Sequence, residues 1–273
     1  MSDTLSTLVT FAGFCAFVEA VRRALVRRQL DEIVFEHPEK FDEAERHRRP
    51  RVGATVLFAA LAATGIARAQ QTIFNVPTAD VLEKGKVYAE NDDLWRPQEP
   101  EFASFAFRGV YGFGGNVEGG VNLGGVVTPG RSTPTATAAI KWQPVKTGNF
   151  ALTTGAHGLF FLRGSEDGAP AGHFYAHGSY AFPTNTRFTA GGWVATPGYA
   201  SSKTTGGALA GLEQKLAEHL NLIADWYSGK NEIGYFTPGF SSTWGGFTLY
   251  AGYSFKNGES KGNAMLFELG WNF

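Results

Sequence analysis

The chain has 273 residues, of which 43% are hydrophobic and 18% are charged, and its formal net charge is −1. This near-neutral charge excludes the basic surface that nucleic-acid binding requires, and a slightly polar mean hydropathy of −0.14 excludes a bundle of membrane-spanning helices. The 14% of aromatic residues and the 35 glycines are both high for an ordinary soluble domain. They suit a strongly curved β-sheet, in which glycine relieves crowding.

The first 45 residues contain an apolar stretch, Leu5 to Val18, followed by a segment of mixed charge with helical spacing. Three interpretations stay open for this extension: an unusually long leader, a start codon assigned too far upstream, and a cytoplasmic membrane anchor whose basic residues stay inside. We favour the start-codon explanation. The single cysteine, Cys15, lies here, so the exported part of the chain is expected to have no disulfide bonds.

Residues 46–69 have the three parts of a signal peptide. A basic cluster precedes an apolar run over residues 52–66, which ends at the small residues Ala67 and Ala69. The run of about 15 residues is too short to span a membrane comfortably, which takes roughly 20. We therefore predict cleavage directly before Gln70, and the competing interpretation is a short buried helix.

From Gln70 onward the pattern changes to two-residue alternation, which is typical of β-strands. Gly, Pro, Asn and Ser recur about every 15 residues and divide the chain into candidate strands. We expect residues 70–84 to form a periplasmic lead-in and residues 85–273 to form a β-barrel. The candidate strands are 86–94, 102–111, 116–126, 134–142, 149–162, 172–182, 186–195, 204–212, 220–227, 232–240, 245–255 and 263–273.

The expected connections alternate in length. Short links such as GFGG, QPVKTG, PTN and SSTW alternate with looser, more polar segments such as RPQEPE, VTPGRST and RGSEDGAP. Short turns on one side and longer loops on the other are typical of bacterial transmembrane barrels, which also have an even number of strands. The competing fold is a soluble β-sandwich, whose strands alternate in the same way.

The last strand separates the two folds. It reads NAMLFELGWNF, with apolar residues at every second position and an aromatic residue at the end. The residues of this face are Met265, Phe267, Leu269, Trp271 and Phe273. A soluble sandwich has no reason to end on such a strand, whereas this ending resembles the C-terminal signal read by the outer-membrane barrel assembly machinery.

On these residues the chain resembles the porin-like outer-membrane β-barrels of Gram-negative bacteria. The entry to the first strand, FNVPTADVLEKGKVYAE, is also similar to the openings of porin-like proteins with no assigned substrate. The resemblance implies an all-β, antiparallel transmembrane barrel of about twelve strands after a helical leader. It also implies contact with outer-membrane lipid and with the assembly machinery.

Apolar side chains should face lipid and polar ones the lumen. The residues expected to line the lumen are Glu90, Asp92, Arg108, Glu118, Lys141, His157, His177, Arg187, Asp225 and Glu268. These charges leave two functions open: a passive channel for small hydrophilic solutes with a transverse field, and a non-conducting structural or adhesive barrel with a salt-bridged lumen. We favour the channel. Five tryptophans near expected strand ends, at 142, 193, 226, 244 and 271, predict an interfacial belt.

One motif has a catalytic interpretation. An outer-membrane phospholipase uses a serine and a histidine two residues apart, and this chain contains His177-Gly178-Ser179. The alternation directs both side chains into the lumen, whereas that enzyme presents its dyad to lipid, so we expect no enzymatic activity. His157 and His173 also face inward, with His157 expected almost opposite His177. Three histidines suit a metal, but their spacing is weak evidence, so we expect no metal and no cofactor.

Overall fold

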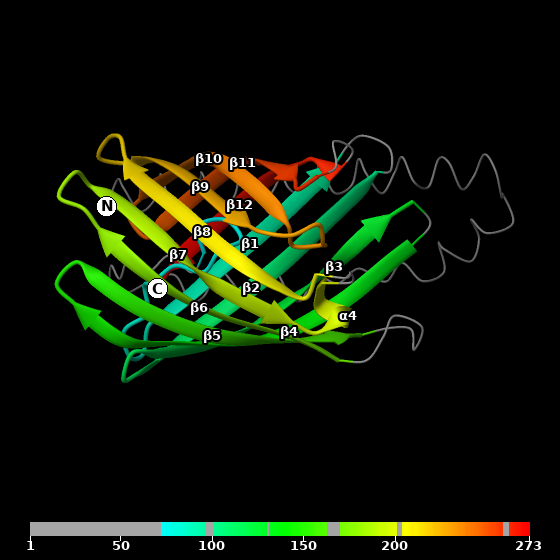
Figure 1. Cartoon of the computed structure of the whole chain (residues 1–273), viewed down its shortest axis with the longest axis horizontal. Coiled ribbons are helices and arrows are strands. Elements are labelled where there is room, and N and C mark those ends of the chain that lie inside the picture. The colour runs from blue at the N-terminus through cyan, green and yellow to red at the C-terminus, as the bar shows by residue number, and fades with distance from the viewer. Residues whose placement is uncertain (1–71, 97–100, 130, 163–169, 201–203, 259–261) are drawn as a thin grey trace, which may run out of the picture. The chain divides into compact units, whose positions relative to one another are not determined.

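The computed structural model of the protein describes residues 72–96, 101–129, 131–162, 170–200, 204–258 and 262–273. The expected N-terminal extension and signal peptide lie outside these residues. Within them, no helix has the length and apolar character needed to cross a membrane. Twelve antiparallel strands in this part of the chain form one closed barrel (Figure 1).

The elements, in chain order, are β1 (Val87–Arg96), β2 (Phe102–Gly114), β3 (Val117–Thr128), β4 (Arg131–Thr147), β5 (Phe150–Phe161), β6 (Ala171–Ala181), β7 (Thr186–Ala195), α4 (Pro197–Ala200), β8 (Gly206–Lys215), β9 (Leu220–Tyr227), β10 (Tyr235–Trp244), β11 (Phe247–Lys256) and β12 (Ala264–Asn272). Each strand pairs with its neighbours in sequence, and β12 pairs with β1 to close the sheet. Closure gives every strand two partners, so no edge is left with unpaired backbone groups. The predicted all-β barrel of about twelve strands is confirmed.

The two ends of the barrel differ. One end, here called the turn end, carries the short connections from β2 to β3, β4 to β5 and β10 to β11, and also the start of β1 and the end of β12 (left in Figure 1). In the two-residue turn between β2 and β3, Gly115 and Asn116 both have positive φ, at 63° and 59°, which favours these two residue types. The other end, here called the loop end, includes α4.

Several strands are longer than expected, and β4 differs most. It runs from Arg131 to Thr147 and thus includes the last three residues of the predicted link VTPGRST and most of the predicted link QPVKTG. A register shift against β5 lies between Trp142 and Val145. The shift contains a proline, which cannot donate a ladder hydrogen bond and is tolerated at such bulges. The SSTW segment, also predicted to be a link, forms the end of β10.

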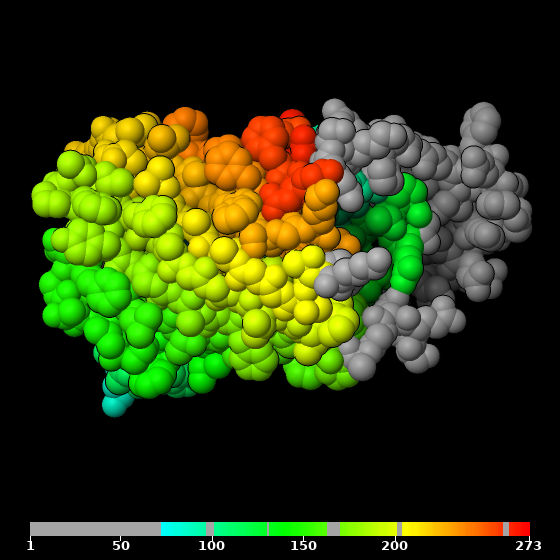
Figure 2. Space-filling model, in the orientation of Figure 1, coloured from blue at the N-terminus to red at the C-terminus, as the bar shows by residue number. Residues whose placement is uncertain are grey.

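The two faces of the wall differ in exposure along each strand. On β9, Leu222 and Trp226 are 36% and 37% exposed, whereas the alternate residues Ile223 and Asp225 are buried. The outer surface therefore presents large apolar side chains over successive strands, which follow one another in chain order in Figure 2. A continuous apolar wall around a polar interior is the structure that a lipid bilayer requires.

One predicted member of the aromatic belt lies elsewhere. Trp193 is only 3% exposed and points inward, where it packs against His173 and Tyr227. Trp142, Trp226 and Trp244 are exposed on the outer wall. Trp193 was assigned to the belt because it lies near a strand end. Alternation along β7 instead puts it on the same face as the buried Thr189.

Candidate functional site

The structure places all ten residues predicted to line the lumen on the inner face of the wall. Six of them are at most 5% exposed: Glu90, Glu118, Lys141, His177, Asp225 and Glu268. The other four are partly buried. Ten polar side chains from nine strands thus converge on one interior.

Residues 72–84, here called the inserted segment, lie inside this interior, except for the exposed Glu83 and Lys84 at their end. We expected this stretch to precede the barrel as a periplasmic lead-in, but Ile73, Phe74, Val76 and Leu82 are each at most 2% exposed among the inward side chains of the wall. The tip of the segment is a tight turn, in which the N–H of Ile73 donates to the carbonyl of Val76 over 2.8 Å. From this turn within the lumen the chain runs to the turn end, where β1 begins.

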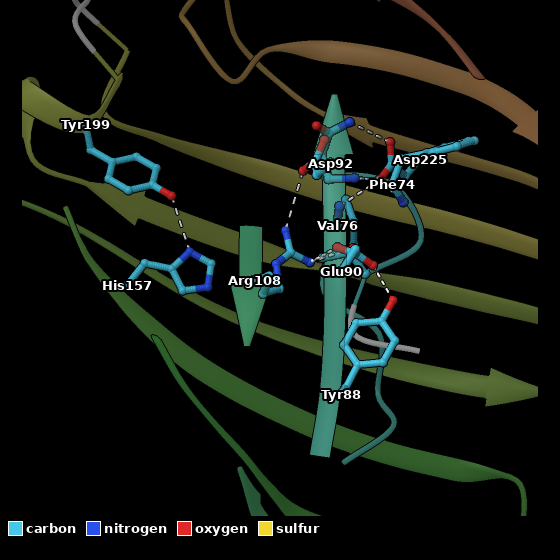
Figure 3. A network of polar contacts seen from close by, with 11 residues as sticks. Phe74, Val76, Tyr88, Glu90, Asp92, Arg108, His157, Tyr199 and Asp225 are labelled. Carbon is cyan, nitrogen blue, oxygen red and sulfur yellow. Dashed lines mark hydrogen bonds and ion pairs between the residues drawn. The ribbon is translucent and has the colours of Figure 1, made fainter. Parts of the chain in front are cut away.

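A single carboxylate holds the tip of the inserted segment. Asp225 Oδ2 on β9 accepts hydrogen bonds from the consecutive backbone N–H groups of Phe74, Asn75 and Val76 (Figure 3). The Asn75 amide also donates to Thr237 Oγ1 over 3.3 Å. Successive N–H groups in a turn form an anion-binding concavity, so Asp225 satisfies backbone donors that would otherwise be buried without a partner.

Glycines in the wall make room for the apolar side chains of the tip. A Cβ at Gly252 would lie 2.7 Å from the ring of Phe74, and one at Gly239 would lie 2.6 Å from it. A Cβ at Gly211 would collide with the end of the Ile73 side chain. Only glycine allows this close approach, so the wall and the inserted segment fit one another.

Further polar contacts tie the inserted segment to the wall near the turn end. The N–H of Leu82 donates to Glu118 Oε2 over 2.7 Å, and the Gln143 amide donates to the carbonyl of Ala79. Arg187 forms a 2.6 Å ion pair with Asp80. The segment is thus fixed to β3, β4 and β7 near its exit and to β9 at its tip.

The bases of the lumen are paired with acids on adjacent strands. Glu90 and Arg108 are register partners on β1 and β2 and form a 2.7 Å ion pair, and Arg108 also lies 3.6 Å from Asp92. Lys141 and Glu118 form a 2.8 Å pair between β4 and β3. Such neighbours neutralise each other along the wall, as in the salt-bridged lumen that the sequence left open beside a transverse field.

Arg187, the third base of the lumen, is also paired with an acid on an adjacent strand. Arg187 on β7 pairs with Glu213, its register partner on β8, over 2.5 Å. Glu213 lies one residue beyond the expected end of this strand at residue 212, so it was not predicted to face the lumen. Asp225 and Glu268 form no ion pair within the described residues, and neither carboxylate oxygen of the buried Glu268 has a hydrogen-bond partner there. The lumen therefore retains a surplus of acidic groups.

The inward histidines lie close together but pair differently from our expectation. His157 is the register partner of His173, with ring centroids 5.3 Å apart, whereas His177 lies opposite Thr153. Tyr199 of α4 hydrogen-bonds His157 Nδ1 over 3.2 Å (Figure 3). Burial raises the pKa of Tyr199 to about 12, so its hydroxyl stays protonated. It donates to His157 Nδ1 or accepts from it according to the histidine tautomer.

Within the described residues, these side chains have neither the contacts of a catalytic dyad nor those of a metal site. The Ser179 hydroxyl is buried and hydrogen-bonds Thr189 over 2.7 Å, and both ring nitrogens of His177 are buried with no hydrogen-bond partner in the described part of the chain. A nucleophile needs its base within hydrogen-bond reach. Across the same residues, no three His, Cys, Asp or Glu side chains converge as a metal site would need.

A cavity of about 250 Å³ lies inside the barrel beside the tip of the inserted segment. Its lining includes Phe74 and Asn75 from the segment, inward residues of the wall, and Tyr199 from the loop end. Little in the sequence predicts this arrangement. The apolar FNVP stretch before β1 was its one local signal, because such residues need a buried environment.

No protein-family model and no curated protein sequence matches the chain. Solved structures similar to it include the translocator domain of the autotransporter NalP from Neisseria meningitidis, with 16% identity and a TM-score of 0.39 over 71% of this chain and 90% of that one. They also include outer membrane phospholipase A from Escherichia coli, with 10% identity and a TM-score of 0.42 over 69% and 90%.

An outer membrane channel from Pseudomonas putida is similar at 11% identity, with a TM-score of 0.42 over 71% of this chain and 98% of that one. At such values no function transfers from any of the three proteins. The functional assignment therefore rests on the geometry of this barrel: an apolar outer wall, a polar lumen, and a segment of the same chain inside it.

Proposed function

We propose that the protein is an outer-membrane channel for small hydrophilic solutes, which the inserted segment closes and which opens when this segment leaves the lumen. A twelve-stranded barrel lies between the filled eight-stranded barrels and the open porins of sixteen strands, so its bore is wide enough for a narrow pore once emptied. The observation that carries the proposal is the polar attachment of the tip through Asp225. Water can replace these hydrogen bonds when the segment withdraws.

The predicted leader gives the inserted segment a free end. Cleavage before Gln70 would leave the new N-terminus two residues ahead of Thr72, the first described residue of the segment. A segment held covalently only at β1 can leave through the turn end without opening the barrel. The apolar wall and the C-terminal strand support an outer-membrane location, with the turn end in the periplasm.

The alternative is a non-conducting structural barrel. The glycine positions that accommodate Ile73 and Phe74, and the ion pair between Arg187 and Asp80, favour a permanently filled lumen. Both functions require the same apolar outer wall. They differ only in whether the inserted segment leaves.

A reversible cross-link separates the two functions. The Asn75 and Thr237 side chains are in contact, so the double variant Asn75→Cys/Thr237→Cys should form a disulfide that fixes the tip to β10. In planar bilayers we expect single-channel openings from the reduced protein and none after oxidation. Each single-cysteine variant serves as the control, because it conducts in both states.

A truncation provides the complementary measurement. Removal of residues 72–80 should give a larger and continuously open conductance, because the lumen then holds no segment. Correct folding is verified by heat-modifiable migration on gels, in which folded barrels run differently from boiled ones. If both the wild type and the folded truncation are silent in bilayers, the channel proposal is wrong and the structural barrel stands.

A further inference from the structure

The cavity beside the inserted segment has an aromatic side and a polar side. His173 stacks on Tyr199 with ring centroids 5.0 Å apart and planes inclined by 13°. Tyr175 and Tyr227 lie within 6 Å of the same imidazole. All four residues line the cavity, and they come from β6, α4 and β9. Flat apolar faces are therefore gathered at one place in an otherwise polar lumen.

Polar groups in the same cavity have hydrogen-bonding capacity that the described residues do not use. His173 is 2% exposed, and neither of its ring nitrogens has a hydrogen-bond partner there. The buried Oδ1 of Asn122, another lining residue, also lacks a partner among them. A neutral imidazole offers one donor and one acceptor, and an amide oxygen offers a second acceptor. Buried groups of this kind need a partner, which a bound solute can supply.

Each charged group that lines the cavity has an oppositely charged neighbour within the protein. Arg108 lies between Glu90 and Asp92, and Lys141 is paired with Glu118. Glu232 lies 3.8 Å from Lys256. The site therefore offers no isolated charge as the main attraction for an ion. Its complement is a neutral molecule that has hydroxyl donors and acceptors around an apolar ring face.

We infer that this cavity binds a neutral saccharide of about monosaccharide size. The volume of about 250 Å³ corresponds to about eight water molecules at roughly 30 Å³ each, which is enough for one sugar ring. The C–H face of the ring packs on the aromatic residues, and its hydroxyls bond His173 and Asn122. The inference rests on the proposed channel function, for which it names the solute class, and the cavity is a binding site on the path of that solute.

Ligand-observed saturation-transfer NMR on the folded protein in detergent tests this assignment. The probes are D-glucose, cationic D-glucosamine and anionic D-glucuronate, which share one ring and differ in charge. We expect saturable binding of D-glucose with a Kd in the millimolar range, and weaker binding of both charged sugars. Absence of saturable glucose binding, or tighter binding of a charged sugar, overturns the assignment.

Matched variants locate the site. His173→Phe keeps a ring but removes both nitrogens, and it should weaken glucose binding at least tenfold. The control His219→Phe makes the same change in the turn between β8 and β9, outside the cavity, and should bind glucose as the wild type does. Tyr199→Ala provides a second variant outside the strands, so its loss of binding does not depend on the folding of the barrel wall.

The outcomes separate this inference from the channel function. Glucose binding that His173→Phe abolishes, in a protein that never conducts, would retain the saccharide site and overturn the channel. Conductance without glucose binding would retain the channel and overturn the saccharide site. Binding that neither His173→Phe nor Tyr199→Ala weakens would also overturn the site.

Discussion

The carboxylate of Asp225 accepts a hydrogen bond from the backbone N–H of Phe74, although 151 residues separate the two in sequence. The same oxygen accepts the N–H groups of Asn75 and Val76. Hydrogen bonds to a charged group contribute about 1.5–3 kcal/mol each. One side chain of the wall thus determines much of the free energy that keeps the inserted segment in the lumen.

Replacement of Asp225 should release the tip. In Asp225→Ala the three N–H groups lose their acceptor, so we expect the open fraction in planar bilayers to rise at least tenfold, which corresponds to about 1.4 kcal/mol. Asp93→Asn is the control, because Asp93 lies on the outer face of β1 as the register partner of the exposed Phe105. An unchanged open fraction in Asp225→Ala would show that the tip does not limit opening.

The fit between Phe74 and Gly252 is testable with a compensating pair. Gly252→Ala places a methyl group against the Phe74 ring and should destabilise the inserted position by about 1–3 kcal/mol. Phe74→Ala in the same chain removes the collision. We expect thiol labelling of Asn75→Cys to become faster in Gly252→Ala and to slow again in the double variant. Equal labelling rates in all backgrounds would contradict the fit.

The buried pair Lys141 and Glu118 should be sensitive to the loss of one partner. Lys141→Met leaves Glu118 buried without its base, and we expect it to lower the free energy of unfolding by about 3–5 kcal/mol. Adding Glu118→Gln removes the charge and should restore most of that loss. Urea unfolding followed by tryptophan fluorescence measures both, with exposed Lys146→Met on the same strand as the control. A loss in Lys146→Met as large as that in Lys141→Met would refute the importance of the pair.

Because the outer wall faces lipid, the loss of stability caused by a charged substitution should depend on its depth in the bilayer. Phe107→Arg introduces a charge in the middle of β2 and should lower folding stability in vesicles by roughly 2–4 kcal/mol. The same change at Phe113, near the turn end, should cost only about 0–1 kcal/mol, because its guanidinium can reach the interface. Both phenylalanines are more than half exposed on the outer wall. Equal losses at the two positions would argue against a bilayer around this barrel.

The sequence by itself determined the strands and their faces. Residues two apart on a strand share a face, so the apolar and polar alternation around Phe107 and Arg108 assigns the outer and inner walls without knowledge of strand partners. The same local rule identified the apolar face of β12 and the ten inward residues. It was weaker where Ser, Thr and Pro continue a strand, as at the ends of β4 and in β10.

Only the tertiary structure decided what occupies the lumen and which groups meet there. The contact of Phe74 with Asp225, the pairing of His157 with His173 and the pairing of Arg187 with Glu213 depend on register and on barrel closure. The inserted segment has no alternation of its own, because its side chains are buried by a wall that forms from residues later in the chain. Local periodicity carries no information about such long-range contacts, whereas packing inside a closed barrel determines them.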